Sequence, residues 1–248
     1  MPVTIAHPAA VLPLRRLGLP MVALVIGSVA PDLPVFLGAW GVYGVTHSAL
    51  GIVSVDLVVA LAVLLLWFTA VRDALVDMAP QRLRIRLRPR VRLSGREWLL
   101  AVPAACLGAL THVGWDSFTH ADRWGTSRIA WLREEHAGLL GAQWAQYGSG
   151  VVGSAVLGWY LVHLVRSRKP LAEPRAPRVL PAATLPVVLA AAAATGLLAV
   201  VRHAPDPHAM AYFAVVDGVI ALVVATLAAC VAWHVVRARR VSVSSSPG

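Results

Sequence analysis

The chain has 248 residues, of which 58% are hydrophobic and only 14% are charged, and its mean hydropathy is +0.70. A soluble domain of this length carries roughly a quarter charged residues, so the composition excludes an ordinary soluble protein and predicts an all-α, polytopic membrane protein. The formal net charge of +10 could indicate a nucleic-acid partner, but the basic residues lie in short segments between apolar stretches. We therefore expect membrane lipid around the protein and no nucleic acid.

Six apolar segments approach the length of about 20 residues that a helix needs to cross a bilayer. The first is interrupted by Pro31 and Pro34, and proline inside a helix removes a hydrogen bond and clashes with the preceding turn. We expect a bundle of about six spans that begins with a broken helical hairpin, in which Pro8–Arg16 runs one way and Pro20–Ala30 returns. The six segments are Leu19–Trp40, Leu50–Val71, Trp98–Phe118, Tyr147–Val165, Val179–Val201 and Tyr212–Val236.

The basic residues divide unevenly between the two sides of such a bundle. Eighteen lie on the side of the Arg82–Arg92 loop, and four lie on the other side. The positive-inside rule then predicts a multi-pass protein of the bacterial cytoplasmic (inner) membrane with both termini in the cytoplasm. The hairpin would bring His7 level with Asp32, which conflicts with a simple cytoplasmic N-terminus, so the placement of residues 1–16 stays open. The four residues on the outer side are Arg123, Arg128, Arg133 and Arg202.

The Arg82–Arg92 loop places an arginine at every second position, alternating with Leu, Ile, Pro and Val. This alternation suits either a short strand or an interfacial segment, and we expect the loop to bind anionic lipid headgroups. For the whole chain we expect a membrane domain over residues 1–165, a two-helix membrane scaffold over residues 179–240 and a disordered tail over residues 241–248.

A stripe of ionisable residues closes the third apolar segment. His112, Asp116 and His120 stand four residues apart, so on a helix they share one face, and Gly108 extends that face with bare backbone. Ionisable groups at membrane depth are costly and usually face a bundle interior or an aqueous cavity, where they mark function. Histidine and aspartate are also common metal ligands, so the stripe predicts a metal site.

The spacing of the stripe leaves three arrangements open. If the helix continues, His112 and His120 differ by ~12 Å along its axis, which is too far for one ion. Either His112 and Asp116 bind one ion with His120 behind them, or two ions lie along the stripe with Asp116 between them. In the third arrangement the helix ends near Ser117 and turns His120 back.

Four motifs, in order, resemble a bacterial membrane family defined as domain of unknown function 4184. They are His7 to Pro13, Gly27 to Asp32, His47 to Gly51 and Thr111 to His120, and the resemblance covers most of residues 2–160. The pattern is distantly similar to inner-membrane metal-dependent hydrolases, whose corresponding elements occur in the same order. By analogy this implies a metal-assisted hydrolase. The chain departs from that pattern at Pro34, where a second acidic residue often stands, which leaves the number of ions open.

The resulting hypothesis is a membrane-embedded hydrolase that acts on a lipid-linked ester or phosphate at the outer face. His47, His112 and Asp116 would hold a divalent ion, with zinc preferred, and a bound water would become the nucleophile. A competing hypothesis is an ion- or proton-coupled transporter that uses the same residues, and a third is a non-catalytic membrane subunit. The other candidate residues are His7, Asp32 and His120 as further ligands, Asp32 or Asp56 as general base, and Gln146 and Tyr147 as substrate-binding donors.

Overall fold

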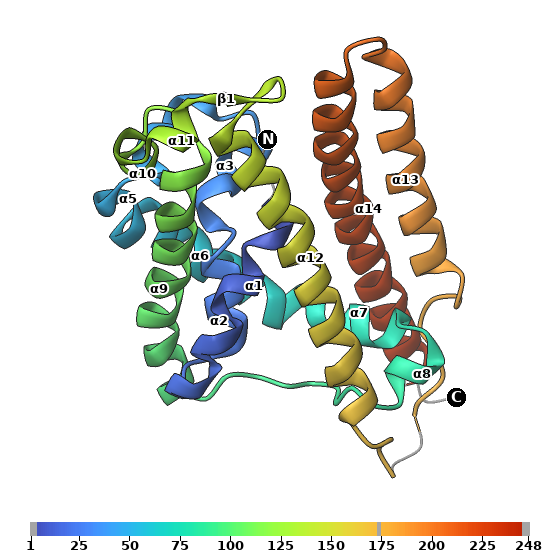
Figure 1. Cartoon of the computed structure of the whole chain (residues 1–248). Helices are drawn as coiled ribbons and strands as arrows, with labels where there is room; N and C mark the ends of the chain where they lie inside the picture. The colour runs from blue at the N-terminus through green and yellow to red at the C-terminus, as the bar shows by residue number, and fades with distance from the viewer. Residues whose placement is uncertain (1–3, 173–174, 245–248) are drawn as a thin grey trace. The chain divides into compact units, whose positions relative to one another are not determined.

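The computed structural model describes residues 4–172 and 175–244, and its regular structure is helical apart from one small hairpin (Figure 1). The hairpin pairs β1 (Glu135–His136) antiparallel with β2 (Leu139–Leu140). The chain separates into two compact units, which are described one at a time. This architecture confirms the predicted all-α class.

The first unit comprises Met1–Leu65 and Leu93–Leu164. It begins with a series of short helices and continues with longer ones. The 3-10 helices are η1 (Thr4–Ala6), η2 (Leu12–Leu17), η3 (Ala30–Asp32) and η4 (Trp40–Val42). The α-helices are α1 (Pro8–Val11), α2 (Met21–Gly27), α3 (Leu33–Phe36), α4 (Tyr43–Thr46), α5 (Ala49–Val53), α6 (Val55–Leu66), α9 (Gly95–Thr119), α10 (Trp124–Arg128), α11 (Ala130–Arg133) and α12 (Gly141–Ser167).

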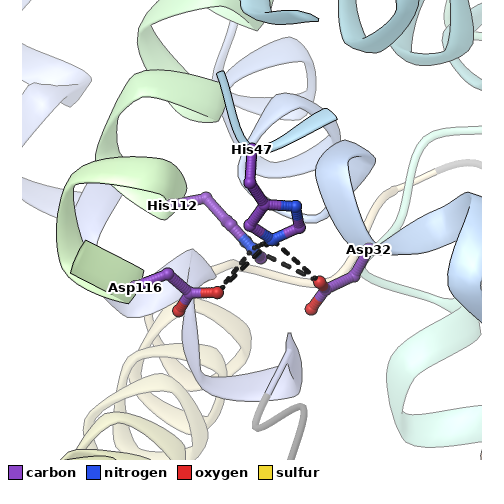
Figure 2. A group of neighbouring side chains, drawn as sticks. All are labelled: Asp32, His47, His112 and Asp116. Atoms are coloured by element: carbon purple, nitrogen blue, oxygen red, sulfur yellow. Dashed lines mark hydrogen bonds and ion pairs between the residues drawn. The ribbon is translucent and has the colours of Figure 1, made fainter. Parts of the chain in front are cut away.

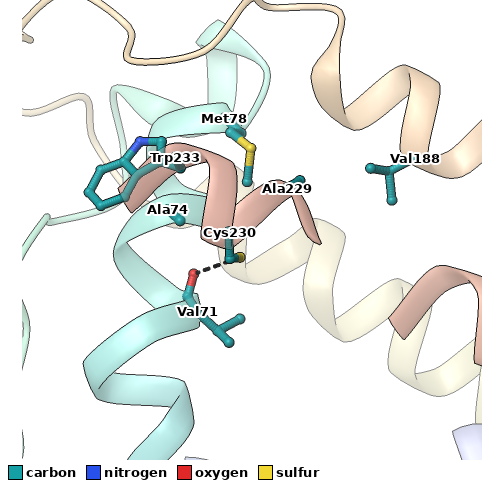
Figure 3. Close-up of a cluster of buried hydrophobic side chains, with 7 residues drawn as sticks. All are labelled: Val71, Ala74, Met78, Val188, Ala229, Cys230 and Trp233. Atoms are coloured by element: carbon teal, nitrogen blue, oxygen red, sulfur yellow. Dashed lines mark hydrogen bonds between the residues drawn. The ribbon is translucent and has the colours of Figure 1, made fainter. Parts of the chain in front are cut away.

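The second unit comprises Leu66–Arg92 and Val165–Gly248. Its core joins the end of the second apolar segment to the last two helices through buried side chains that include Met78, Cys230 and Trp233 (Figure 3). Its elements are the π-helical stretch η5 (Trp67–Val71), α7 (Arg72–Met78), α8 (Gln81–Arg84), α13 (Thr184–Arg202) and α14 (Pro207–Ser244).

Within the described part of the chain, five helices are long and apolar enough to cross a membrane by length and composition. The first of the six predicted segments instead gives a shorter apolar stretch, Met21–Phe36, which is broken after α2 into η3 and α3. Pro31 and Pro34 lie at this break. They explain it, because neither residue can donate the backbone hydrogen bond that a continuous helix requires. The five long stretches are Ala49–Met78, Gly95–Thr119, Gly141–Ser167, Thr184–Arg202 and Pro207–Ser242.

The N-terminal residues form the predicted helical hairpin. Gly18 makes the turn with φ +71°, a left-handed conformation that glycine adopts without a steric penalty. The two arms end beside each other, because the Thr4 hydroxyl donates a hydrogen bond to the Asp32 carboxylate. The beginning of the chain therefore returns to the level of the Pro31-Asp32 break, as the sequence predicted.

Helix α9 carries two members of the site, His112 and Asp116. A capping box starts it: Ser94 accepts from the Glu97 backbone N–H, and the Glu97 carboxylate accepts from the Ser94 N–H. Two glycines let α9 and α2 approach closely. A Cβ added to Gly108 would lie 2.3 Å from the Leu24 carbonyl oxygen, and one added to Gly27 would lie 2.2 Å from the Ala105 carbonyl oxygen. Backbone therefore packs against backbone at this crossing.

Two features of the second unit add to the sequence predictions. The Arg82–Arg92 loop contains one helical turn, α8, followed by irregular chain, and it forms no strand. The sequence predicts two helices after residue 179 as a separate scaffold. The second unit contains these two helices and also the Leu66–Arg92 segment, which includes this loop. Helix α14 continues to Ser244, so the first four residues of the predicted tail are helical, and residues 245–248 lie outside the described part.

Candidate metal centre

Four buried side chains from separate parts of the first unit converge on one point (Figure 2). Asp32 is the last residue of η3, and His47 follows α4 directly. His112 and Asp116 come from the same face of α9, as their spacing predicted. Each residue offers one ligand atom, and the four atoms all lie within 4.8 Å of one another.

The distances between these atoms are nearly equal. The Nε2 atoms of His47 and His112 lie 3.3 Å apart. From His47 Nε2, both Asp32 Oδ1 and Asp116 Oδ2 lie at 3.4 Å. From His112 Nε2, the same two oxygens lie at 3.5 and 3.4 Å. Five of the six edges of a four-atom cluster therefore have one common length.

This length fits a divalent ion with four ligands. Five edges of 3.3–3.5 Å, with the two carboxylate oxygens no more than 4.8 Å apart, place a common centre roughly 2.1–2.4 Å from each of the four ligand atoms. Zinc bonds to histidine nitrogen and carboxylate oxygen are about 2.0–2.2 Å long. The two imidazoles and two carboxylates present could therefore hold one divalent metal ion.

The same distances are too long for ordinary hydrogen bonds. Charge-assisted N–H···O bonds are about 2.7–2.9 Å long, and neutral ones are about 2.7–3.2 Å long. Each imidazole Nε2 instead lies at about one distance from three different partners. Of these contacts only the one between the two Nε2 atoms, at 3.3 Å, lies within reach of a weak hydrogen bond, and all five distances surround one shared centre.

Hydrogen bonds behind the site fix the orientation of both imidazoles. His112 Nδ1 lies 2.8 Å from the Ser28 carbonyl oxygen, and His47 Nδ1 lies 3.1 Å from the Tyr43 carbonyl oxygen. A carbonyl oxygen only accepts, so His112 Nδ1 carries a proton and donates it; His47 Nδ1 contacts both the Tyr43 carbonyl and the Thr46 hydroxyl, the latter at 3.0 Å. A neutral imidazole then has its lone pair on Nε2, which points to the centre, and this is the arrangement seen in metal-ligating histidines. Asp32 is held from its other oxygen by the Thr4 hydroxyl.

The competing arrangement contains no metal ion and instead pairs protonated histidines with the two aspartates. Two imidazolium groups would balance the charges of Asp32 and Asp116. Both Nε2 atoms would then carry hydrogens, and two N–H donors would face each other across 3.3 Å. One divalent ion balances the same two carboxylates while both imidazoles stay neutral, without that repulsion.

His7 and His120 lie against Asp116 and are not members of the four-atom group. The His7 ring stacks on His112 with 3.8 Å between centroids, and its Nε2 lies 3.4 Å from Asp116 Oδ1. Burial lowers the pKa of His7 to about 4, so its imidazole is neutral. His120 Nδ1 lies 3.5 Å from Asp116 Oδ2.

The end of α9 corresponds to the third arrangement of the stripe, in which His120 turns back, and the number of ions stays a prediction. Helix α9 ends at Thr119, and His120 is extended with φ −120° and ψ 141°. The helix therefore ends two residues beyond Ser117, and the histidine turns back toward Asp116. Its Nε2 lies 3.2 Å from Nε2 of Gln146 on α12, so Gln146 supports the side chain of His120.

Asp56 and Tyr147 lie apart from the four-atom group. Asp56 is fully buried in α6, and neither of its carboxylate oxygens has a hydrogen-bond partner among the described residues. Tyr147 is half-buried in α12, and its predicted contact with a substrate stays a prediction.

Three residues that hold the site were not predicted from the sequence. Ser28 and Tyr43 act through their backbone carbonyls, and no side-chain pattern reports which carbonyl an imidazole will meet. Thr4 lies 28 residues from Asp32 in the chain, and only the hairpin brings the two together. The hairpin itself was readable from its prolines and Gly18, so it was the one available signal for Thr4.

Comparison with known proteins places the chain in a family. A family model described as "Domain of unknown function (DUF4184)" matches residues 1–237, a range that includes every residue of the metal centre. No curated protein and no solved structure matches the chain. Since the match spans nearly the whole sequence, the chain belongs to the DUF4184 family.

Proposed function

We propose that the protein is a membrane-embedded, metal-dependent hydrolase that acts on a lipid-linked ester or phosphate. The observation that carries the proposal is the convergence of His47 Nε2, His112 Nε2, Asp32 Oδ1 and Asp116 Oδ2 on one buried point, with five of their six separations at 3.3–3.5 Å. Such a set is suited to one divalent cation, and its two nitrogens and two oxygens favour zinc.

The ion would supply Lewis-acid polarisation of the scissile group and activation of a water molecule. The chain's own residues have separate tasks. Asp32 and Asp116 bring the negative charge that holds a cation at this depth, and the two imidazoles complete the set. The Ser28 and Tyr43 carbonyls keep both rings aimed at the centre, which is the usual task of residues behind a metal ligand.

Proton transfer requires a group outside the four-atom set. Asp56 is a candidate general base, because its buried carboxylate has no hydrogen-bond partner among the described residues and so is free to accept a proton. His120 is the second candidate, since its imidazole lies beside Asp116 and is half-buried. Asp32 is less suited to this task, because one of its oxygens belongs to the four-atom set and the other accepts from Thr4.

The substrate class follows from the setting of the site. The site lies in a unit that contributes to three candidate spans, and its residues are buried among apolar helices. A substrate that is anchored in the bilayer by an acyl or isoprenoid chain can reach such a position by diffusion within the membrane.

Orientation is part of the proposal. The 18 to 4 distribution of basic residues supports an inner-membrane protein with both termini in the cytoplasm. His120 then lies at the end of α9 that faces outward. The centre would accept its substrate from the outer leaflet.

Hydrolysis by the purified protein tests the proposal. Wild type in detergent would be incubated with zinc and with a panel of lipid-linked phosphate and carboxylic esters, and release of the free headgroup would be measured. Asp116→Ala should abolish the release, and Gly114→Ala, on an exposed and open position of the same helix, should retain it. If wild type binds the ion but cleaves no member of the panel, the hydrolase proposal fails and an ion-coupled transporter takes its place.

A further inference from the structure

A second polar site lies in the other unit and contains none of the residues of the metal centre. It is a pocket of about 340 Å³. Its wall is formed by α7, the loop that follows α8, the segment leading into α13, and the C-terminal part of α14. Four arginines and two aspartates line it, and the four arginines are Arg84, Arg90, Arg175 and Arg237.

Asp77 and Arg84 form the fixed floor of this pocket. Asp77 Oδ1 accepts from Arg84 Nη2 at 2.7 Å and from Arg84 Nε at 3.2 Å. Asp77 Oδ2 accepts from the Val179 backbone N–H and from Trp233 Nε1, both at 2.9 Å. The carboxylate is saturated, so it neutralises Arg84 and no other arginine.

The second acidic residue, Asp73, also has its partners outside the side chains of Arg90, Arg175 and Arg237. Asp73 lies 3.1 Å from a guanidinium nitrogen of Arg72 and 3.1 Å from one of Arg92, and it accepts from the Arg90 backbone N–H at 3.0 Å. Neither aspartate therefore offsets the charge of the three remaining arginines of the pocket.

Those three arginines have no acidic partner among the described residues. Arg237 lies over the Trp233 ring, with 5.0 Å from its guanidinium carbon to the ring centroid. Arg175 donates from Nη2 to the Leu87 carbonyl oxygen, and its buried Nε has no partner among the described residues. Neither contact neutralises the positive charge of these side chains at the pocket.

We propose that this pocket binds a phosphate-bearing anion through Arg90, Arg175 and Arg237. The planar guanidinium fork matches the oxygens of a phosphate group, and three such forks around one small pocket supply both charge and directed donors. The sequence predicts that the whole Arg82–Arg92 loop binds anionic lipid. In this proposal only Arg90 of that loop contacts the anion, and Arg175 and Arg237 supply the other two guanidinium groups.

The position of the pocket suits the headgroup of an anionic phospholipid. It lies where α7 ends, where the chain enters α13, and near the end of α14. These are ends of candidate membrane-spanning stretches, and lipid headgroups occupy that level of a bilayer. Inorganic phosphate or a soluble phosphate compound presents the same chemistry, so the experiment must separate the two sources.

The test uses the full chain in a neutral detergent. Native mass spectrometry would measure retention of phosphatidylglycerol after its addition, and calorimetry would measure binding of inorganic phosphate alone. Arg175→Gln with Arg237→Gln should weaken the binding about tenfold or more, the loss expected when a charge-assisted hydrogen bond is removed. Arg202→Gln is the matched control, because this arginine is exposed in α13 of the same unit and lies outside the pocket.

The two binding measurements distinguish a lipid headgroup from a soluble anion. Retention of lipid without binding of free phosphate assigns the pocket to a headgroup, and binding of free phosphate assigns it to a soluble anion. Absence of both, in wild type that elutes as a single species, overturns the proposal. An equal loss in Arg202→Gln also overturns it, because net charge and not the pocket would then govern binding. Arg175→Lys, which keeps the charge but loses the fork, should retain intermediate binding and shows that the site still folds.

Discussion

Substitution of Gly108 by alanine should disturb the metal centre without changing a ligand. The new Cβ would lie 2.3 Å from the Leu24 carbonyl oxygen and 2.7 Å from the Ser28 backbone nitrogen. Ordinary contact begins near 3.4 Å, so α2 and α9 must separate by roughly 1 Å. Ser28 moves with α2, and its carbonyl holds His112 at 2.8 Å. A shift of that size exceeds the tolerance of about 0.2 Å for ligand distances in a metal site.

Two magnitudes follow for the Gly108→Ala variant. Overpacking at the helix crossing should destabilise the protein by about 1–3 kcal/mol. Loss of the hydrogen bond behind His112 should weaken metal binding about 10–100-fold. Thermal unfolding in detergent would measure the first effect, and titration with a zinc-competing chelator would measure the second.

Gly114→Ala is the matched control, since it makes the same change in the same helix at a position with nothing within 4 Å. It should leave metal binding unchanged and should raise the free energy of unfolding by at most about 1 kcal/mol, because alanine favours a helix over glycine. If Gly108→Ala behaves like this control, the close packing of α2 on α9 does not position the centre, and the reasoning is refuted.

Three further predictions concern other parts of the chain. His120→Ala should weaken metal binding only ~10–100-fold, as measured by chelator competition, because His120 lies behind a ligand; complete loss would make it a ligand. Reporter fusions should place Arg175 in the cytoplasm and Arg128 outside, and a cytoplasmic signal at Arg128 would reverse the orientation. Asp77→Ala should destabilise the protein by about 3–5 kcal/mol in thermal unfolding, because it leaves the buried Arg84 guanidinium unpaired; an unchanged melting temperature would contradict this.

The elements of the fold that were predictable have strong local signals. Continuous apolar runs predicted the five long helices, because a bilayer requires a minimum length of apolar helix. Pro31 and Pro34 predicted the break in the first segment, since proline removes a helical hydrogen bond. The π-helical stretch η5 and the division into two units have no such local signal, because they arise from packing between distant segments.

The site was predictable to the level of its residues. The spacing of His112 and Asp116 predicted that both lie on one face of a helix. The motifs that contain Asp32 and His47 added these two residues as candidate ligands. The sequence could not separate the four members of the group from His7 and His120, because that distinction depends on where α9 ends and where the hairpin returns. Ring orientation was equally out of reach, since it depends on the backbone carbonyls of Ser28 and Tyr43.

The metal content of the purified protein tests the central claim most directly. Elemental analysis of wild type, Asp116→Ala and Gly114→Ala would be carried out after exposure to zinc and removal of free ions. We expect about one divalent ion per chain in wild type and in Gly114→Ala, and none in Asp116→Ala, because that variant loses one of four ligands and half of the charge that balances the ion. Wild type without stoichiometric metal, or Asp116→Ala with a full complement, would contradict the assignment of these four residues as a metal centre.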